Sequence, residues 1–163
     1  MKIPAYLQKG DTVAMVCTAR SFTRDEAQEA VALFESWGLN IIFGSTIDIN
    51  ANQLGGTDAQ RTDDLQRMMD DDAIKAIWIA RGGYGTVRII DQLDFSKFIK
   101  NPKWIIGFSD ITVLHSHIHN LGIATLHAIM PYSVAKALNE AKETLHNALF
   151  NKDYTIEIPS NSS

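Results

Sequence analysis

The sequence predicts an α/β domain with a doubly wound, mainly parallel sheet and helices on both faces. Two observations support this fold class. Short apolar runs alternate with stretches whose apolar residues recur at the helical period, as in a chain that alternates strands with helices. The expected strands are almost continuously apolar, which is typical of strands buried on both faces.

The first expected strand, residues 13–16, is an apolar run that follows the turn at Gly10-Asp11. A helix is expected over 25–37, because its apolar residues recur close to the helical period and Gly38 stands where a helix C-cap belongs. A second apolar run at 41–43 predicts the next strand.

A polar stretch rich in asparagine and glycine, residues 44–56, predicts a long loop. Thr57 is suited to cap a helix that runs to about residue 69. The apolar run 76–80 predicts the third strand. A glycine-rich turn at 81–85 then leads into a short helix expected over 86–93.

The fourth strand is expected at 103–107 and the following helix at 110–120, because an apolar run ends in a turn and a helical pattern then stops before Gly122. A fifth strand is expected at 123–126. The remaining expected elements are helices around 132–138 and 140–150 and a sixth strand at 154–158. We expect one α/β domain over 1–158 and a linker or frayed tail over 159–163.

Composition excludes several classes of protein. The chain has 163 residues with 15 Lys+Arg against 19 Asp+Glu, a net charge of −4, which argues against a nucleic-acid binder. The single cysteine, Cys17, excludes an internal disulfide framework and a cysteine-rich zinc site. No apolar run reaches the roughly 18 residues that would indicate a membrane span. No secretory signal core follows Met1, so we expect a cytoplasmic protein.

The strongest local signal for chemistry is the segment 105–112, Ile-Ile-Gly-Phe-Ser-Asp-Ile-Thr. Ser109 lies on the turn between an expected strand and an expected helix, at the strand's carboxyl end, where open α/β sheets bind ligands. Such a turn lifts a serine hydroxyl above the sheet, as in a nucleophile elbow, although Ile111 replaces the second glycine of that motif. Alternatively, Ser109 or Asp110 simply caps the helix.

A second signal is the turn Arg81-Gly82-Gly83-Tyr84-Gly85, again between a strand and a helix. It matches neither a Walker A loop nor a dinucleotide-binding fingerprint. Glycines allow backbone N–H groups to approach an anion or an oxyanion closely, but they also occur in tight turns that need positive φ. Two such loops at neighbouring strand ends can supply one nucleophile and one oxyanion donor.

The histidines and the acidic run carry weaker signals. In a helix only His115 and His119 of the cluster 115–119 share a face, and packing or solvation is the favoured interpretation. His127 follows the fifth expected strand and lies at the same edge of the sheet. Asp70-Asp71-Asp72 is interpreted as a solvated turn, and Cys17 as a small buried side chain. A general base for Ser109 is not evident in the sequence.

The motifs at 81–85 and 107–112, together with Gly10-Asp11-Thr12-Val13, 93–95 and 101–103, resemble the LD-carboxypeptidase family over most of the chain. The resemblance implies a serine peptidase of the Ser-Glu-His type with no metal and no cofactor. It implies that Ser109 is the nucleophile and that the main-chain N–H groups of Asp110 and of Gly82 or Gly83 hold the oxyanion. Arg81 either holds a substrate carboxylate or simply pins the loop, and Tyr84 is a second candidate substrate-binding residue.

The resemblance further implies that the glutamate and the histidine lie in a C-terminal catalytic domain, which we expect to be absent from this chain. The implied substrate is a cytoplasmic murein tetrapeptide, from which terminal D-alanine is released during peptidoglycan recycling. The isolated chain is expected to be inactive, and an exposed apolar patch near Phe108 and Met130 is expected to favour a homodimer.

The chain departs from the family pattern in two places. Residues 17–21, Cys-Thr-Ala-Arg-Ser, stand where the family commonly has Pro-Ser, and residues 127–130, His-Ala-Ile-Met, stand where it commonly has His-Gly-Pro-Met. A sister branch that resembles microcin C immunity proteins shares the serine motif and cleaves acyl-sulfamoyl adenylates. That activity, a non-catalytic α/β domain that binds a small anion, and an inactive truncation product remain the alternatives.

Overall fold

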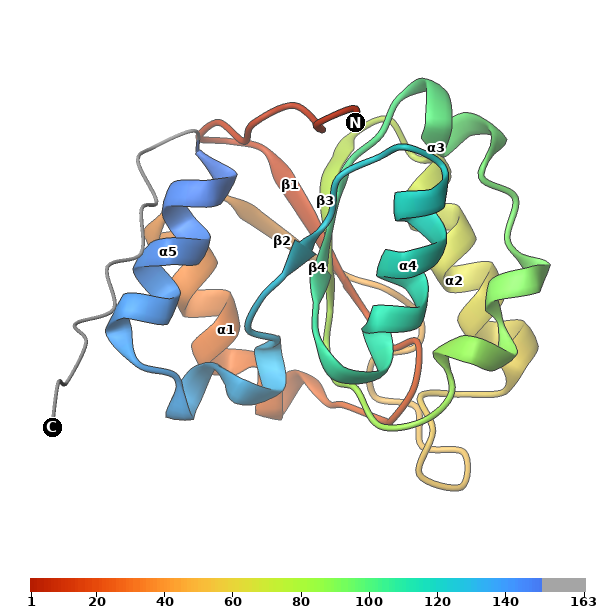
Figure 1. Cartoon of the computed structure of the whole chain (residues 1–163). Helices are drawn as coiled ribbons and strands as arrows, with labels where there is room; N and C mark the ends of the chain where they lie inside the picture. The colour runs from red at the N-terminus through yellow and green to blue at the C-terminus, as the bar shows by residue number, and fades with distance from the viewer. Residues whose placement is uncertain (151–163) are drawn as a thin grey trace, which may run out of the picture.

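The computed structural model describes residues 1–150 and contains a five-stranded parallel sheet with the strand order β2-β1-β3-β4-β5. Figure 1 shows this sheet in the middle of the molecule with a helical layer on each side, which confirms the predicted fold class. The strands are β1 (Thr12–Val16), β2 (Asn40–Phe43), β3 (Ile74–Ile79), β4 (Trp104–Gly107) and β5 (Leu126–His127).

The helices divide between the two faces of the sheet. On one face lie α1 (Arg24–Ser36), α5 (Asn139–Leu149) and the 3-10 helix η4 (Pro131–Lys136). On the other lie α2 (Asp58–Asp70), α3 (Ser96–Lys100) and α4 (Thr112–Asn120), with the short 3-10 helices η1 (Thr86–Arg88), η2 (Ile90–Gln92) and η3 (Ser109–Ile111).

A separate apolar core packs against each face of the sheet. On the α1 side, the Phe34 ring stacks on Trp78 with 3.8 Å between centroids, and both side chains are fully buried. On the α2 side, Leu65, Met68 and Met69 pack inward as the sequence predicts. Burial on both sides explains why the strands are almost continuously apolar.

The predicted helix starts are confirmed by their caps. Thr57 closes a capping box with Gln60 at the start of α2, and Thr23 closes one with Glu26 at the start of α1. At the other end of α1, Gly38 has φ +83°, a left-handed conformation in which a side chain is strained.

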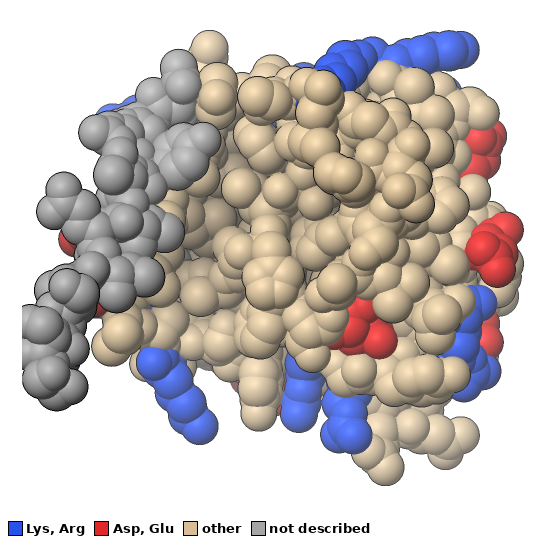
Figure 2. Space-filling model, viewed as in Figure 1, with Lys and Arg blue, Asp and Glu red and all other residues tan. Residues whose placement is uncertain are grey.

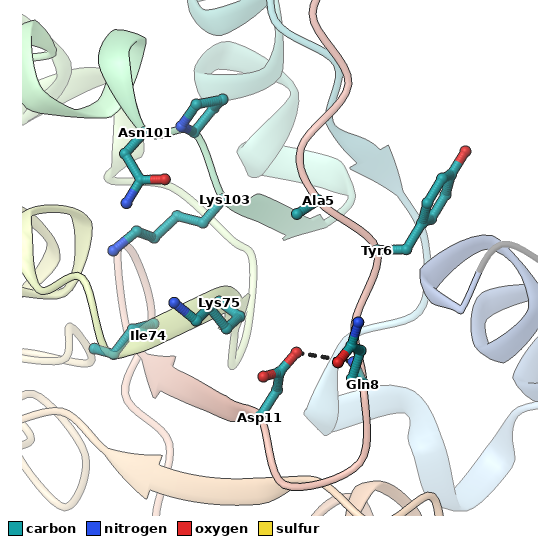
Figure 3. A pocket seen from close by; sticks show the side chains of 9 residues that line it. Ala5, Tyr6, Gln8, Asp11, Ile74, Lys75, Asn101 and Lys103 are labelled. Carbon is teal, nitrogen blue, oxygen red and sulfur yellow. Dashed lines mark hydrogen bonds between the residues drawn. The ribbon is translucent and has the colours of Figure 1, made fainter.

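Lys103 closes the carboxyl end of α2. Its Nζ donates to the carbonyl oxygens of Met68, at 3.2 Å, and of Asp71. Figure 3 shows Lys103 beside Lys75 and Asn101 in a cavity of about 270 Å³ at the amino ends of the strands, opposite the end that carries Ser109. Burial lowers the pKa of Lys103, against the raising effect of Asp71.

Three expectations about elements need correction. The fifth strand lies at 126–127, not 123–126, because Ile123 instead forms an isolated bridge with Lys2. The helix expected at 86–93 is two 3-10 turns. Helix α3 was not predicted. The sixth strand at 154–158 and the tail at 159–163 lie outside the described residues. Within residues 1–150, no helix combines the length and hydrophobicity that a membrane span needs.

Candidate active site

The carboxyl ends of β1, β3 and β4 surround a cavity of about 390 Å³. It lies at the point where the strand order reverses, between β1 and β3, which is where open α/β sheets place their ligands. Ser109 and the glycine turn line it together, as the sequence predicts. The full lining is Arg20, Arg81, Gly82, Gly83, Phe108, Ser109, Met130 and Tyr132.

Ser109 occupies a strained turn directly after β4. Its φ is +64°, a left-handed conformation that residues other than glycine rarely adopt, and its side chain is exposed to solvent. The chain passes at once into η3 and then α4. This strand-turn-helix geometry is that of a nucleophile elbow, with the hydroxyl raised above the sheet.

Gly82 packs directly against the serine. A Cβ on Gly82 would lie 3.2 Å from Ser109 Cβ and 3.3 Å from Ser109 Oγ, closer than side chains normally approach. Gly83, the next residue, has φ +118°, and a Cβ there would collide with the stem of Arg20. Because they lack side chains, Gly82 brings the backbone of this turn close to Ser109 and Gly83 brings it close to Arg20.

Free amide donors surround Ser109. Among the described residues, the backbone N–H groups of Gly82, Gly83 and Asp110 donate to no protein acceptor. Amides left free beside an exposed serine, at the start of a helical segment, are suited to stabilise negative charge on a reacting carbonyl oxygen. The arrangement is compatible with the predicted oxyanion donors.

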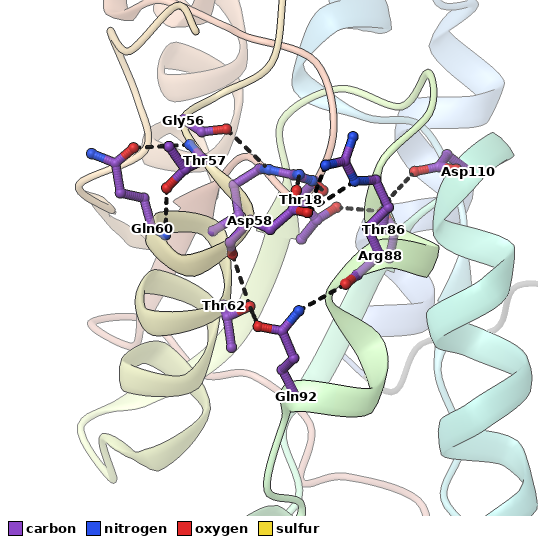
Figure 4. A network of polar contacts seen from close by, with 11 residues as sticks. Thr18, Gly56, Thr57, Asp58, Gln60, Thr62, Thr86, Arg88, Gln92 and Asp110 are labelled. Atoms are coloured by element: carbon purple, nitrogen blue, oxygen red, sulfur yellow. Dashed lines mark hydrogen bonds and ion pairs between the residues drawn. The ribbon is translucent and has the colours of Figure 1, made fainter.

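The Asp110 carboxylate fastens the serine turn to the glycine turn. Its Oδ2 accepts from the Thr86 backbone N–H at 2.9 Å, and the Thr86 hydroxyl lies 2.8 Å from that of Thr18. Figure 4 shows these contacts as parts of one polar network. Asp110 is therefore a positioning group through its side chain, in addition to the predicted role of its N–H.

The same network continues under the glycine turn to α2. The buried Arg61 donates to the carbonyl oxygens of Thr18 and Gly56 and pairs with Asp58. A Cβ on Gly85 would lie 2.6 Å from Arg61 Nη1, so the turn rests directly on this guanidinium. The residues of this network therefore fix the position of the loop after β3 relative to the sheet.

The two predicted substrate-binding residues lie in different settings. Arg81 lines the cavity, with its guanidinium carbon 4.2 Å from the centre of the Tyr132 ring and its Nη1 4.0 Å from Glu26 Oε1. Tyr84 is 63% exposed and does not line the cavity, so its role in binding stays a prediction.

Sequence reasoning missed Arg20 and Tyr132 as lining residues. Arg20 follows β1 and Tyr132 lies in η4, and no local motif marks either one. They reach the cavity because the Arg20 N–H donates to Gly82 O at 3.3 Å and the Tyr132 N–H to Ala80 O at 3.1 Å. Both contacts are long-range, and only the folded topology shows them.

The histidines do not supply a base for Ser109 within residues 1–150. His115 is buried, as predicted for a packing residue, and its Nε2 lies 2.9 Å from Gly107 O. His119, one turn further along α4, is exposed. His127 pairs with Gly107 in the sheet and lines a neighbouring groove with Phe108. No histidine or carboxylate of these residues is hydrogen-bonded to Ser109 Oγ.

The other two candidates, Cys17 and the acidic run 70–72, have surroundings that fit structural roles. Cys17 is fully buried, and burial raises the pKa of its thiol to about 12, as expected for an unreactive small side chain. Asp71 and Asp72 are exposed at the turn after α2. In the part of the chain that the structure describes, no three His, Cys, Asp or Glu side chains come together as metal ligands.

Comparison with protein families gives one match. The model of the LD-carboxypeptidase N-terminal domain (Peptidase_S66) matches residues 13–128. A probable murein peptide carboxypeptidase of Bacillus subtilis (strain 168) is 40% identical over 128 residues, which are 78% of this chain and 40% of that protein. The murein tetrapeptide carboxypeptidase of Pseudomonas aeruginosa is 33% identical over 71% of this chain and 38% of its own length.

Solved structures share the fold. An MccF-like protein from Bacillus anthracis superposes with a TM-score of 0.84 at 25% identity, covering 91% of this chain and 47% of that one. A muramoyltetrapeptide carboxypeptidase from Oxalobacter formigenes has a TM-score of 0.75 at 20% identity, covering 83% and 47%. The chain spans less than half the length of the curated relatives that it matches first.

Proposed function

The chain belongs to the LD-carboxypeptidase family, and from this premise we propose that it carries the nucleophile of a cytoplasmic serine carboxypeptidase. The proposed substrate is a murein tetrapeptide, from which the enzyme releases terminal D-alanine during peptidoglycan recycling. The observation that carries the proposal is Ser109, exposed at φ +64° against Gly82 and beside free backbone amides.

The chemistry follows from this geometry. Ser109 Oγ attacks the carbonyl carbon of the bond before D-alanine, and the oxyanion that forms accepts from the N–H groups of Asp110 and of Gly82 or Gly83. The bond to D-alanine then breaks, leaving an acyl-enzyme that water hydrolyses. The proton acceptor for Ser109 comes from beyond residues 1–150, as the family's glutamate and histidine do by resemblance.

One observation favours a murein peptide over an acyl-sulfamoyl adenylate. The Bacillus subtilis relative of 40% identity and the Pseudomonas aeruginosa relative of 33% identity are named as murein carboxypeptidases. The solved structures of microcin C7 self-immunity protein and of muramoyltetrapeptide carboxypeptidase are 20–23% identical, and both support the fold alone. Residues 17–21 and 127–130, where the chain departs from the family pattern, each contribute one residue to the lining of the cavity, Arg20 and Met130.

The test uses the complete reading frame that contains this chain. The purified protein is incubated with a murein tetrapeptide and, separately, with an aspartyl-sulfamoyl adenylate, and the products are followed by mass spectrometry. We expect D-alanine release, abolished by Ser109→Ala and retained in the control Ser36→Ala, which alters a serine at the end of α1. Release that persists in Ser109→Ala contradicts the proposal, and cleavage of the adenylate alone favours the sister branch.

A further inference from the structure

The Ser109 cavity contains two arginines with different surroundings, Arg20 and Arg81. A carboxypeptidase distinguishes a chain end from an internal bond by the free carboxylate of the leaving residue. Arginine is over-represented where a carboxylate is recognised, because its planar guanidinium donates two parallel hydrogen bonds. On the proposed function, one of these two side chains binds the carboxylate of the leaving residue.

Arg81 is already engaged within the described residues. Its guanidinium lies over the Tyr132 ring at 4.2 Å and 4.0 Å from a Glu26 carboxylate oxygen, and its side chain is 27% exposed. Glu26 already offsets part of its charge, and the aromatic ring covers one face of the guanidinium. These contacts fit a residue that pins the glycine turn against α1 and η4.

The aliphatic part of the Arg20 side chain is held by its neighbours, while its guanidinium has no partner among residues 1–150. Its backbone N–H donates to Gly82 O, and its Cγ, Cδ and Nε lie 2.6, 2.9 and 3.0 Å from where a Cβ on Gly83 would be. The aliphatic part of the Arg20 side chain therefore lies across Gly83, in space that a side chain at position 83 would fill. Within residues 1–150 the guanidinium donates to no acceptor and pairs with no carboxylate.

The spacing of these contacts matches the spacing of the substrate. Gly82 packs on Ser109, the site of attack on the scissile carbonyl, and Gly83, one residue further, packs on Arg20. In the substrate, the carboxylate of D-alanine is likewise one residue beyond the scissile carbonyl. A substrate end that runs along the glycine turn with its carbonyl at Ser109 would have its carboxylate on the side of Gly83 and Arg20.

We propose that Arg20, not Arg81, binds the terminal carboxylate of the leaving D-amino acid and so restricts the enzyme to chain ends. Arg20 is then a specificity-determining residue supplied by the loop after β1, one of the two segments that depart from the family pattern. Gly83 is part of the same device, because a side chain there would displace the arginine stem.

The experiment compares two substrates on the complete protein: the murein tetrapeptide as the free acid and the same peptide with a C-terminal carboxamide. Arg20→Met is expected to lower kcat/KM for the free acid by about 10- to 100-fold, as for a lost charge-assisted hydrogen bond, and to leave the amide almost unchanged. Arg20→Lys should recover part of the loss. The matched control Arg81→Met should change both substrates by the same factor.

Binding separates this inference from the proposed function. In a Ser109→Ala background, calorimetry measures the affinity for each peptide with and without Arg20→Met. We expect the Arg20 change to weaken binding of the free acid only. Equal loss for acid and amide, no loss for either, or a selective loss in Arg81→Met overturns the assignment. Selective binding without D-alanine release in the wild-type protein leaves Arg20 as a carboxylate site and contradicts the proposed function instead.

Discussion

The position of the Ser109 side chain depends on the neighbouring Gly82 as much as on the turn in which Ser109 lies. Gly82 does not have a positive φ, so alanine fits the backbone there, but its Cβ would lie 3.3 Å from Ser109 Oγ. Gly82→Ala should therefore shift the serine by a few tenths of an ångström and narrow the cavity without unfolding the protein. We expect kcat/KM for D-alanine release to fall by roughly 10- to 100-fold.

Thermal unfolding of the Gly82→Ala protein provides the control for that measurement. Its midpoint should remain within a few degrees of wild type, since the added methyl group faces the cavity. Undiminished turnover would show that the close approach of Gly82 to Ser109 has no role in catalysis.

His115 provides a pH-dependent contribution to stability at the base of the serine turn. Burial lowers its pKa, in spite of the hydrogen bond with Gly107 O, and its Nδ1 has no partner among residues 1–150. The unfolded chain therefore takes up the proton first, near pH 6.5. This contribution is complete above that pH and is lost as pH falls below it, by at most about 1.4 kcal/mol per pH unit.

His115→Gln tests this sign, because glutamine keeps a donor for Gly107 O and does not titrate. Urea unfolding at pH 7.5 and 5.5 should show a smaller acid loss in the variant than in wild type. His127, whose ring centre is 6.1 Å from that of His115, is left in place in both proteins. Equal acid losses would mean that His115 is protonated as easily in the folded chain as in the unfolded one.

At the scale of single residues, the sequence predicts what local chemistry determines. Ser109 could be found because an apolar strand, Gly-x-Ser and a helical pattern are all local signals. Arg20 and Tyr132 could not, because they reach the cavity through contacts that join distant loops. The apolar patch expected near Phe108 and Met130 does not include Met130, which is 2% exposed and packs against the α2-side core, whereas Phe108 is half-buried and lines a groove beside β5.

At the scale of elements, the Lys103 side chain contributes more to the free energy of unfolding than its place just before a strand suggests. It is a buried lysine that satisfies two carbonyl groups at the end of α2. Lys103→Met removes the donor to Met68 O, while Asp71 O keeps the bond from the Ile74 N–H, and we expect a cost of about 1–3 kcal/mol in the free energy of unfolding. The control Lys75→Met removes one exposed bond to Asp72 O and should cost less than about 0.5 kcal/mol.

Urea denaturation of both lysine variants measures these values. Similar small losses in the two proteins would show that water replaces Lys103 at the helix end. A large loss only in Lys103→Met would establish that the residue just before β4 fixes the end of α2 through its side chain.

The elements with strong local signals were predicted correctly, and the others were not. Apolar periodicity with Gly38 located α1, and the cap residue Thr57 with the apolar positions after it located α2, each to within a residue. Strand β5 was misplaced, because the apolar run 123–126 is divided between a bridge to Lys2 and the two-residue strand beside β4. Pairing partners far away in the sequence determine that division, and periodicity does not report them.

At the scale of the whole molecule, an uncharged face beside the sheet edge predicts self-association. Grooves of about 340 and 370 Å³ run between β5 and α5, and Ala141 lines both. Figure 2 shows that this face carries few charged side chains. Sedimentation over a concentration series should show dimers that Ala141→Asp disperses and the exposed control Ala135→Asp does not. Monomers at every concentration would contradict the prediction.

The final prediction concerns the activation of Ser109 in the 163-residue chain alone. The described residues supply an elbow and free amides, but His115 is turned to Gly107 and His127 lines another groove. A serine without a base is an ordinary alcohol. A fluorophosphonate probe should therefore label this chain no faster than its Ser109→Ala variant, while the complete protein is labelled at Ser109. Rapid labelling of the chain alone would place the base within these 163 residues and end the proposal that it lies beyond them.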